Sequence, residues 1–379
     1  MQSDIINHYM SMIQTMDKKS SLEGNLAHPV QLTDDLIEEK IEIAIEAISK
    51  VNKIQLSPIG DLKTIISDLS KNGRKAFDAL RQGDADAFTD HSLSGALEVI
   101  VRLDGTRPSF LIKDGKVDKT TNSVGNWENT LDASNDMLSR MIGSVGRIGL
   151  FSNGWPYSGT GFLIQQDIIV TNLHVLQSIA QFGGSSKKWT LNPNATINFG
   201  CELEGTKTFT ERKITSVVFA SGDNTEILYH NTLDMAILSL DPSSEEFEYF
   251  SLSKEAPGIG NPIFAIGYPG PPQLGTYDQT LLDAIFKNTY GYKRLAPGII
   301  NDAFDALPDW TFAHDATTID GSSGSVILVP GEEDQAIGLH YGGLKDAVIE
   351  NYAHSLYNIE GTDITTGKKT QDVLNSLGL

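Results

Sequence analysis

The sequence of 379 residues has one cysteine, Cys201, and few basic side chains. A single cysteine cannot form an intramolecular disulfide, and it excludes a metal site built from several cysteines. Only 29 Lys and Arg stand against 49 Asp and Glu, which gives a net charge of −20. The largest basic cluster is a pair such as Lys187–Lys188. Because binding to nucleic-acid phosphates needs clustered positive charge, we expect no nucleic-acid partner.

Long hydrophobic runs are also missing. No stretch of about 18 apolar residues is present to span a bilayer. The first residues show no basic segment followed by an apolar one, which a secretory signal would require. The solitary cysteine suits a reducing compartment. We therefore expect a cytoplasmic protein with no membrane partner.

The first 142 residues have mostly helical patterns and no catalytic motif. Residues 1–30 are polar and weakly periodic, which predicts a tail. Residues 34–50 place an Ile-rich stripe on one helical face. Asp114-Gly115 lies between apolar runs and predicts a short hairpin over 110–117. The histidines of this region show no metal-ligand spacing, so we expect no metal and no other cofactor.

These patterns divide the chain into segments. They predict a helical N-terminal domain at 31–125, a connecting helix at 126–142 and a third part at 143–379. In that third part, short apolar runs alternate with Gly, Pro, Asn and Asp turns, which is typical of a sandwich or barrel. A final helix is expected at 370–377.

Three segments of the β-rich part carry residues that can act together. His174 follows an apolar strand pattern, Asp234 heads an apolar run, and Ser323 lies in a Gly-Ser-Ser-Gly loop. Taken singly, they are explained as a strand-end histidine, a turn-capping aspartate and an ordinary Gly/Ser turn. Taken together, they follow the His, Asp, Ser chain order of one known type of catalytic triad.

At this point the chain resembles the trypsin-like serine protease family over about residues 143–362. The resemblance rests on the motifs Gly-Thr-Gly-Phe-Leu-Ile, Val-Thr-Asn-Leu-His-Val, Asp-Met-Ala-Ile-Leu, Gly-Tyr-Pro-Gly, Gly-Ser-Ser-Gly-Ser and Gly-Leu-His-Tyr-Gly-Gly. It implies a mainly β fold, the chymotrypsin-like double β-barrel, preceded here by a mostly α-helical domain. It also implies a serine endopeptidase whose substrate is a protein or peptide.

The resemblance assigns roles residue by residue. Ser323 is the expected nucleophile, His174 the general base, and Asp234 the residue that orients the imidazole. The backbone N–H groups of Gly321 and Ser323 are the expected oxyanion hole. Ser322 stands where many relatives carry an aspartate that captures a newly cut N-terminal amine, so we do not expect activation by that route.

The resemblance also implies a primary specificity pocket. Its residues are Thr317, Thr318, His340, Tyr341, Gly342 and Gly343. With no acidic residue at the base, cleavage after Lys or Arg is not expected. His340 with Thr318 resembles glutamyl endopeptidases and viral proteases that cut after Gln, since an imidazole N–H and a hydroxyl can both donate to a side-chain carbonyl oxygen. Glu or Gln is thus expected before the scissile bond, the alternative being a strand histidine satisfied by Tyr341 or water.

Other aspects stay open. Tyr341 replaces a serine that helps many relatives to hold the triad aspartate, which leaves that support in doubt. Residues 1–125 are either a regulator that covers the cleft or a docking domain for a protein partner. By analogy alone, such a protease suggests a regulated bacterial effector. A protease-fold binding or sensor protein with little or no turnover is the alternative function, although a complete triad pattern favours the enzyme.

Overall fold

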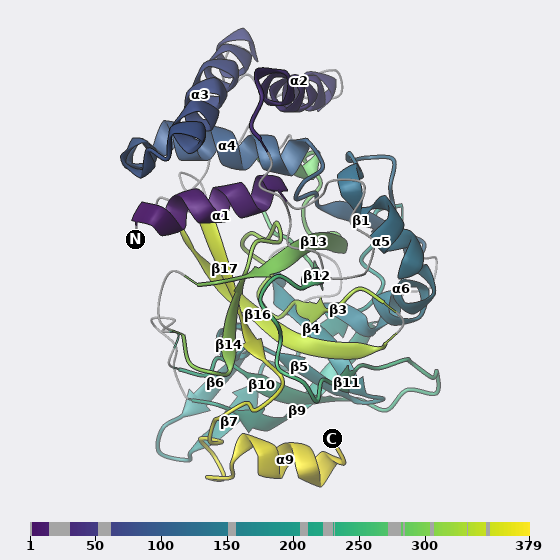
Figure 1. Cartoon of the computed structure of the whole chain (residues 1–379). Helices are drawn as coiled ribbons and strands as arrows, with labels where there is room; N and C mark the ends of the chain where they lie inside the picture. The colour runs from purple at the N-terminus through teal and green to yellow at the C-terminus, as the bar shows by residue number, and fades with distance from the viewer. Residues whose placement is uncertain are drawn as a thin grey trace.

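The computed structural model contains a layer of helices and two β-barrels (Figure 1). The structure describes residues 2–14, 31–51, 62–150, 157–204, 211–222, 230, 232–271, 282, 285–303, 307–331, 333–345 and 349–379. Within these ranges, no helix combines the length and the apolar character that crossing a membrane requires.

The N-terminal part is helical because its apolar residues recur every three or four positions. Its elements are α1 (Gln2–Gln14), α2 (Asp34–Val51), α3 (Leu62–Gln82), the 3₁₀ turn η1 (Ala85–Thr89) and α4 (His91–Leu103). α2 buries Ile37, Ile41 and Ile48 on one face, which confirms the helix predicted there. Asp90 caps α4, since its carboxylate accepts a hydrogen bond of 2.9 Å from the Ser92 N–H.

The prediction of a tail is wrong for residues 2–14, which form α1. Tyr9 and Met12 are fully buried, and the Tyr9 ring packs against Phe88 with 5.1 Å between ring centroids. The apolar residues of this segment share one helical face, although the segment as a whole is polar. The rest of the predicted tail, 15–30, lies outside the described residues.

The predicted hairpin is present as β1 (Phe110–Lys113) and β2 (Lys116–Val117). Asp114 and Gly115 both have a positive φ, as this tight turn requires. β1 also pairs antiparallel with β13 (Arg294–Asn301). The hairpin that the sequence assigned to the N-terminal domain therefore extends a sheet of the C-terminal part.

The first barrel closes through six strands. Its segment of the chain contains β3 (Val145–Gly149), β4 (Tyr157–Gln165), β5 (Ile168–Thr171), α7 (Leu173–Ile179), β6 (Ala180–Gly183), β7 (Lys188–Leu191), β8 (Thr196–Asn198), β9 (Glu211–Ala220) and β10 (Ala236–Leu240). The barrel order is β10-β5-β4-β3-β8-β9, while β6 and β7 pair separately. Buried aliphatic side chains such as Ile148, Leu163 and Leu238 fill the interior.

The rest of the chain contains β11 (Ser251–Leu252), β12 (Pro262–Gly267), β14 (Thr311–His314), β15 (Val326–Leu328), β16 (Gln335–Lys345), β17 (Ile349–Ser355) and the terminal helix α9 (Thr370–Leu377). With β13, five of these strands form the second barrel in the order β12-β15-β16-β17-β14-β13, which closes because β12 pairs with both β15 and β13. The predicted fold class, a mainly β double barrel preceded by helices, is confirmed.

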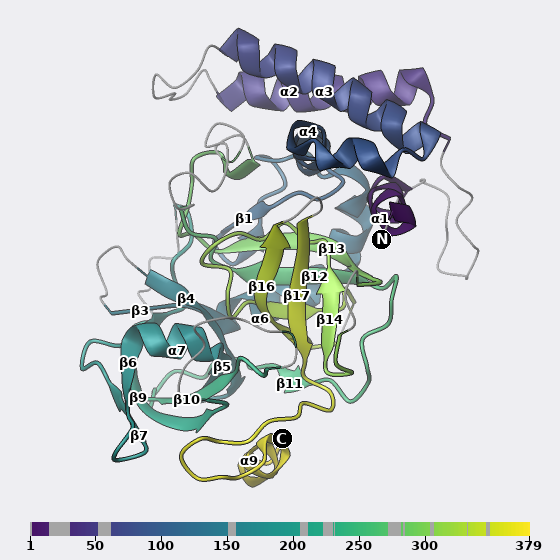
Figure 2. The same cartoon turned by 90° about the vertical axis from the view of Figure 1, so that its left-hand side faces the viewer.

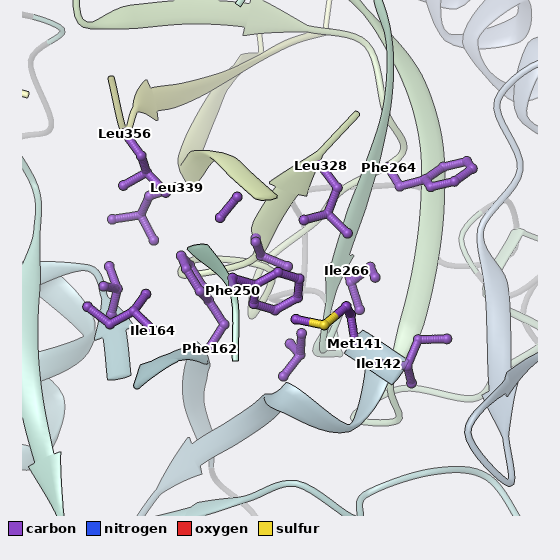
Figure 3. Close-up of a cluster of buried hydrophobic side chains, with 14 of the residues drawn as sticks. Met141, Ile142, Phe162, Ile164, Phe250, Phe264, Ile266, Leu328, Leu339 and Leu356 are labelled. Atoms are coloured by element: carbon purple, nitrogen blue, oxygen red, sulfur yellow. The ribbon is translucent and has the colours of Figure 1, made fainter. Parts of the chain in front are cut away.

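The segment that joins the two parts is broken rather than one helix. It consists of η2 (Gly125–Trp127), α5 (Glu128–Ala133), α6 (Asn135–Met141) and η3 (Ile142–Ser144). Its buried side chains belong to the main core, where Met141 and Ile142 lie near Phe162, Phe250 and Ile266 (Figure 3). The rings of Phe162 and Phe250 meet edge to face at 5.8 Å.

A second core joins the helices to the second barrel. Leu282, Ile285 and Phe286, from the connection between β12 and β13, are buried among side chains of α1 to α4. Ile319, which lies four residues before Ser323, packs against the same cluster. Figures 1 and 2 show α1 to α4 on one side of the second barrel and the first barrel on the other side, where Figure 2 also shows α7.

Phe110→Ala tests whether the hairpin of β1 and β2 shares the main core with the barrels. Phe110 is fully buried in the main core, so its truncation is expected to lower the free energy of unfolding by about 3–5 kcal/mol. Denaturant unfolding followed by near-UV circular dichroism measures the change. Lys116→Ala, at an exposed position of the same hairpin, is the control and is expected to change stability by less than about 0.5 kcal/mol. Equal stability of the two variants would contradict a shared core.

Candidate active site

His174 lies where β5 ends and α7 begins. Asn172 has an extended backbone, and the chain then turns into the helix so that His174 falls in its first turn. The ring nitrogen Nδ1 of His174 is 2.6 Å from Asp234 Oδ2, and its backbone N–H donates to Asp234 Oδ1 at 3.0 Å. The His174 side chain is 26% exposed, whereas that of Asp234 is 1% exposed. Part of the His174 side chain is therefore accessible, while Nδ1 is fixed by the carboxylate.

Asp234 is a buried carboxylate that is fully engaged. Both of its oxygens accept hydrogen bonds from His174, and its backbone carbonyl accepts one of 2.9 Å from Asn172 Nδ2. Burial of a charge is costly unless such bonds replace its hydration. The carboxylate accepts a hydrogen bond from the N–H at Nδ1. The lone pair of His174 therefore lies on Nε2, where a general base needs it.

His354 of β17 holds Asp234 from behind, and sequence reasoning missed it. The Asp234 N–H donates to His354 Nε2 at 3.0 Å, which requires a neutral ring with its proton on Nδ1. Burial lowers the pKa of His354 to about 3, so the ring stays neutral. Tyr341 stacks on it at 4.1 Å, and the Tyr341 hydroxyl pairs with His230 Nδ1 at 2.7 Å. The support that the sequence left in doubt is supplied by an imidazole backed by Tyr341.

Ser323 lies in a loop held between the two barrels. The Thr160 N–H of β4 donates to the Ser323 carbonyl at 2.7 Å, and the Gly324 N–H donates to the His340 carbonyl at 2.9 Å. Gly324 has φ +86°, and a Cβ there would lie 1.9 Å from the Thr160 carbonyl oxygen. Only glycine fits this position.

The loop and α7 meet over Gly159 of β4. A Cβ on Gly159 would lie 2.6 Å from the Val175 side chain and 2.9 Å from the Ser323 carbonyl oxygen. The structure thus places Ser323 beside the residue that follows His174. No hydrogen bond between the Ser323 hydroxyl and His174 is found in the described part of the chain. Such a bond is often long before substrate binds.

The backbone of the loop leaves two donors available. The N–H groups of Ser322, Gly324 and Ser325 donate to the carbonyls of Ile319, His340 and Ser322. Over the described ranges, no hydrogen bond is made by the N–H of Gly321 or of Ser323. Gly321 has φ +87°, a conformation that favours glycine. These two N–H groups are the ones that the sequence predicted for an oxyanion hole.

His340 of β16 is buried and paired with a second histidine. Its Nδ1 is 3.2 Å from His314 Nε2. His314 Nδ1 is buried with no partner in the described residues, so it is better left as a lone pair than as an N–H. His314 then donates through Nε2, and the proton of His340 lies on Nε2. Burial lowers the pKa of His314 to about 3 and that of His340 well below its usual range.

The two threonines differ from expectation. The Thr318 hydroxyl donates to Asn351 Oδ1 at 2.7 Å, and Asn351 Nδ2 donates to the Ala316 carbonyl, which fixes the amide. The hydroxyl proton that was expected for a substrate is therefore already used. The Thr317 hydroxyl donates to the Arg107 carbonyl at 2.6 Å and faces the helical part. Sequence reasoning could not see either partner, because both are distant in the chain.

The remaining predicted pocket residues lie on β16. Tyr341 is 3% exposed and packs behind Asp234, whereas Gly342 is half-buried and Gly343 is exposed. Gly342 and Gly343 pair with Tyr352 and Asn351 of β17. Among the residues that the structure describes, no group of three or more His, Cys, Asp or Glu side chains is arranged to hold a metal ion.

Comparison with known proteins agrees with this geometry. The family model of the trypsin-like peptidase domain matches residues 159–339 of the chain. A protein of Lysobacter enzymogenes named as a probable serine protease is 30% identical over 302 residues, which are 73% of this chain and 76% of the relative. The chain belongs to the trypsin-like serine proteases.

This trypsin-like protease is also similar to solved structures. A Glu endopeptidase is 17% identical, with a TM-score of 0.42, over 62% of this chain and 90% of the other. Neuropsin of mouse brain is 13% identical, with a TM-score of 0.41, over 57% of this chain and 90% of the other. Likenesses this distant say nothing about the substrate of the protease.

His354→Gln tests the neutral ring behind Asp234. An unfolded histidine takes up its proton near pH 6.5, whereas His354 in the folded protease does so only near pH 3. Its contribution to stability is therefore complete above pH 6.5 and is lost as the pH falls from there towards 3. At pH 5 this linkage costs about 2 kcal/mol.

The variant removes that linkage while its amide oxygen can still accept the Asp234 N–H. The fall in unfolding free energy from pH 8 to pH 5, measured by urea denaturation, is expected to be about 2 kcal/mol smaller than in wild type. His91→Gln removes an exposed histidine of α4 and is expected to leave the fall as in wild type. An unchanged fall in His354→Gln would show that the ring is not buried neutral.

Proposed function

We propose that this trypsin-like serine protease cleaves peptide bonds through an acyl-enzyme, with His174, Asp234 and Ser323 as its triad. The observation that carries the proposal is the double hydrogen bond from His174 to the buried carboxylate of Asp234. It leaves the lone pair of His174 on Nε2, next to the loop that holds Ser323. A protein with no turnover has no need of a base prepared in this way.

The proposed reaction follows from these positions. Ser323 Oγ attacks the carbonyl carbon of the scissile bond while its proton passes to His174 Nε2. The carbonyl oxygen becomes an oxyanion and is bound by the N–H groups of Gly321 and Ser323. Return of the proton to the leaving amine breaks the C–N bond. The oxygen of a water molecule then attacks the acyl carbon while one proton of the water passes to His174 Nε2. That proton moves to Ser323 Oγ as the bond between Oγ and the acyl carbon breaks, which releases the acid and restores the serine.

We further propose a preference for Glu or Gln before the scissile bond. The hydrogen bond between His314 and His340 supports it, because it places the proton of His340 on Nε2. The support is partial, since the His340 ring also makes a hydrogen bond with the Tyr352 backbone. An N–H donor at Nε2 is satisfied by a side-chain carbonyl or carboxylate oxygen and is left unpaired by an apolar group. Thr318 supports this less than expected, since its proton is given to Asn351.

For the helical part, we propose a role that regulates the protease. The packing of Ile319 and of residues 285–286 against the helices supports action on the pocket from behind. It gives less support to a domain that covers the cleft, because α1 to α4 lie on the side of the second barrel away from α7 (Figure 2). A docking role for a protein partner is the alternative.

A reducing, cytoplasmic setting remains part of the proposal. It is supported by the single cysteine of the sequence, since relatives that work outside the cell often rely on disulfides. Cys201 is partly buried, and burial raises the pKa of its thiol. Its side chain is thus a small packing group rather than a nucleophile.

Ser323→Ala tests the nucleophile. Wild type is expected to be labelled by a fluorophosphonate probe and to hydrolyse peptides, while the variant does neither, because the hydroxyl is the group acylated. Ser322→Ala is the matched control and is expected to keep its label, since its hydroxyl accepts the Ile319 N–H inside the loop. A folded wild-type protein that neither labels nor hydrolyses would favour the alternative of a binding or sensor protein.

His340→Leu tests the pocket. On peptides that differ only before the scissile bond, wild type is expected to prefer Glu or Gln over Leu by about 100-fold or more in kcat/KM. The variant is expected to lose that preference because the donor is gone. His91→Leu is the control, with the wild-type preference retained. Preferred cleavage by wild type after Arg, Lys or Phe would refute the assignment of His340.

A further inference from the structure

A segment of the helical part runs directly behind the pocket. It connects α4 to β1 and contains Arg107, which is fully buried. Arg107 Nε and Nη2 lie 2.6 Å from Asp315 Oδ1 and Oδ2, and both side chains are 0% exposed. Asp315 directly follows β14 and stands two residues before Thr317. An ion pair with two hydrogen bonds therefore joins the helical part to Asp315. This residue begins the segment 315–321, which we call the pocket segment.

Both members of the ion pair make further hydrogen bonds to the backbone. Asp315 Oδ1 also accepts the Ile299 N–H at 2.7 Å, and Arg107 Nη1 donates to the Thr106 carbonyl at 2.8 Å. The guanidinium lies 5.9 Å from the centre of the Trp127 ring. A buried carboxylate without its partner would be strongly unfavourable, so the pair holds Asp315 at one position and orientation.

The same side of the pocket segment touches the helical part at every second residue. Asp315 pairs with Arg107, the Thr317 hydroxyl donates to the Arg107 carbonyl, and Ile319 packs into the helical core. Thr318 faces the other way, towards Asn351 of β17. This alternation is that of an extended chain with one side bound. The last of these contacts, at Ile319, lies two residues before Gly321, the first proposed oxyanion donor.

A second arginine joins the connection between β12 and β13 to the segment that contains Arg107. Arg294 is buried, and its Nη1 donates to the Ser109 carbonyl at 2.7 Å. Its Nη2 donates to the Phe286 carbonyl and to Thr289 Oγ1. Residues 107–109 thus contact the pocket segment directly, and Arg294 links Ser109 to the connection between β12 and β13.

Among the described residues, the position before the proposed nucleophile makes no ion pair. It is the buried Ser322, whose hydroxyl accepts a hydrogen bond of 3.3 Å from the Ile319 N–H. No carboxylate at this position can tie the loop to a cation. The charge that orders the pocket segment is found eight residues before Ser323, at Asp315, and its cation comes from the helical part.

We propose that Arg107 is a positioning residue for the protease. Through Asp315 and Thr317 it holds residues 315–321, and with them the pocket base and the Gly321 N–H, in the geometry that substrate needs. The helical part is then required for activity and is not an inhibitor. This inference rests on the proposed function of the site, but the ordering of 315–321 can be measured without activity.

The experiment compares Arg107→Met, Arg107→Lys and wild type in the full chain. In a Ser323→Ala background, hydrogen exchange of residues 311–326 is expected to be about tenfold faster in Arg107→Met, with exchange at 163–170 of the first barrel unchanged. With Ser323 present, kcat/KM is expected to fall by about 100-fold. In Arg107→Met, the ratio of kcat/KM on Glu peptides to kcat/KM on Leu peptides is expected to be smaller than in wild type. Arg107→Lys keeps the positive charge but loses the guanidinium that makes two hydrogen bonds to Asp315. Its exchange rate and kcat/KM are expected to lie between those of wild type and Arg107→Met.

Controls separate this role from general stability. The double variant Arg102→Met with Glu98→Gln removes an ion pair within α4, and it is expected to keep wild-type exchange at 311–326 and the wild-type peptide ratio. If Arg107→Met does not fold, Arg107→Met with Asp315→Leu removes both charges and is expected to show the same local effects.

The outcomes are distinct. A folded Arg107→Met, or the folded double variant, with wild-type exchange at 311–326 and wild-type kinetics would overturn the inference. A wild-type protein that hydrolyses no peptide would overturn the proposed function instead. In that case the exchange measurement still decides whether Arg107 orders the segment.

Discussion

The buried pairing of Arg107 with Asp315 is the contact on which the joining of helices and barrels depends. Both side chains are fully buried, and the two charges are tolerable there because they pair with each other and are further hydrogen-bonded by the Ile299 N–H and the Thr106 carbonyl. Around this pair, β1 is paired with β13 and Phe110 enters the main core. Charge, strand pairing and packing thus join the two parts at one place, and the parts are one structural unit.

The site is built from neutral rings around a single carboxylate. His314, His340 and His354 are buried, and burial lowers the pKa of each. A neutral imidazole offers one donor and one acceptor in a fixed direction, so these rings act as directional hydrogen-bonding groups. Asp234 places a negative charge directly beside His174.

Sequence reasoning succeeded where the signal was local. The short apolar runs predicted a sandwich or barrel, and the resemblance carried by the motifs around His174, Asp234 and Ser323 implied the double barrel. The structure brings His174 onto Asp234. Sequence reasoning failed where a contact depends on which strands become neighbours. His354 has no motif of its own, and the partners of Thr318 and Asp315 lie far away in the chain.

The pairing of β1 with β13 constrains the order in which the chain can fold. Phe110 faces Leu295, so the ribosome makes one partner long before the other. Contacts of such long range form late, after local helices. The second barrel, and with it the loop of Ser323, can be completed only after its last strand, β17, has been synthesised. A nascent chain that has not yet reached β17 would therefore carry no assembled site.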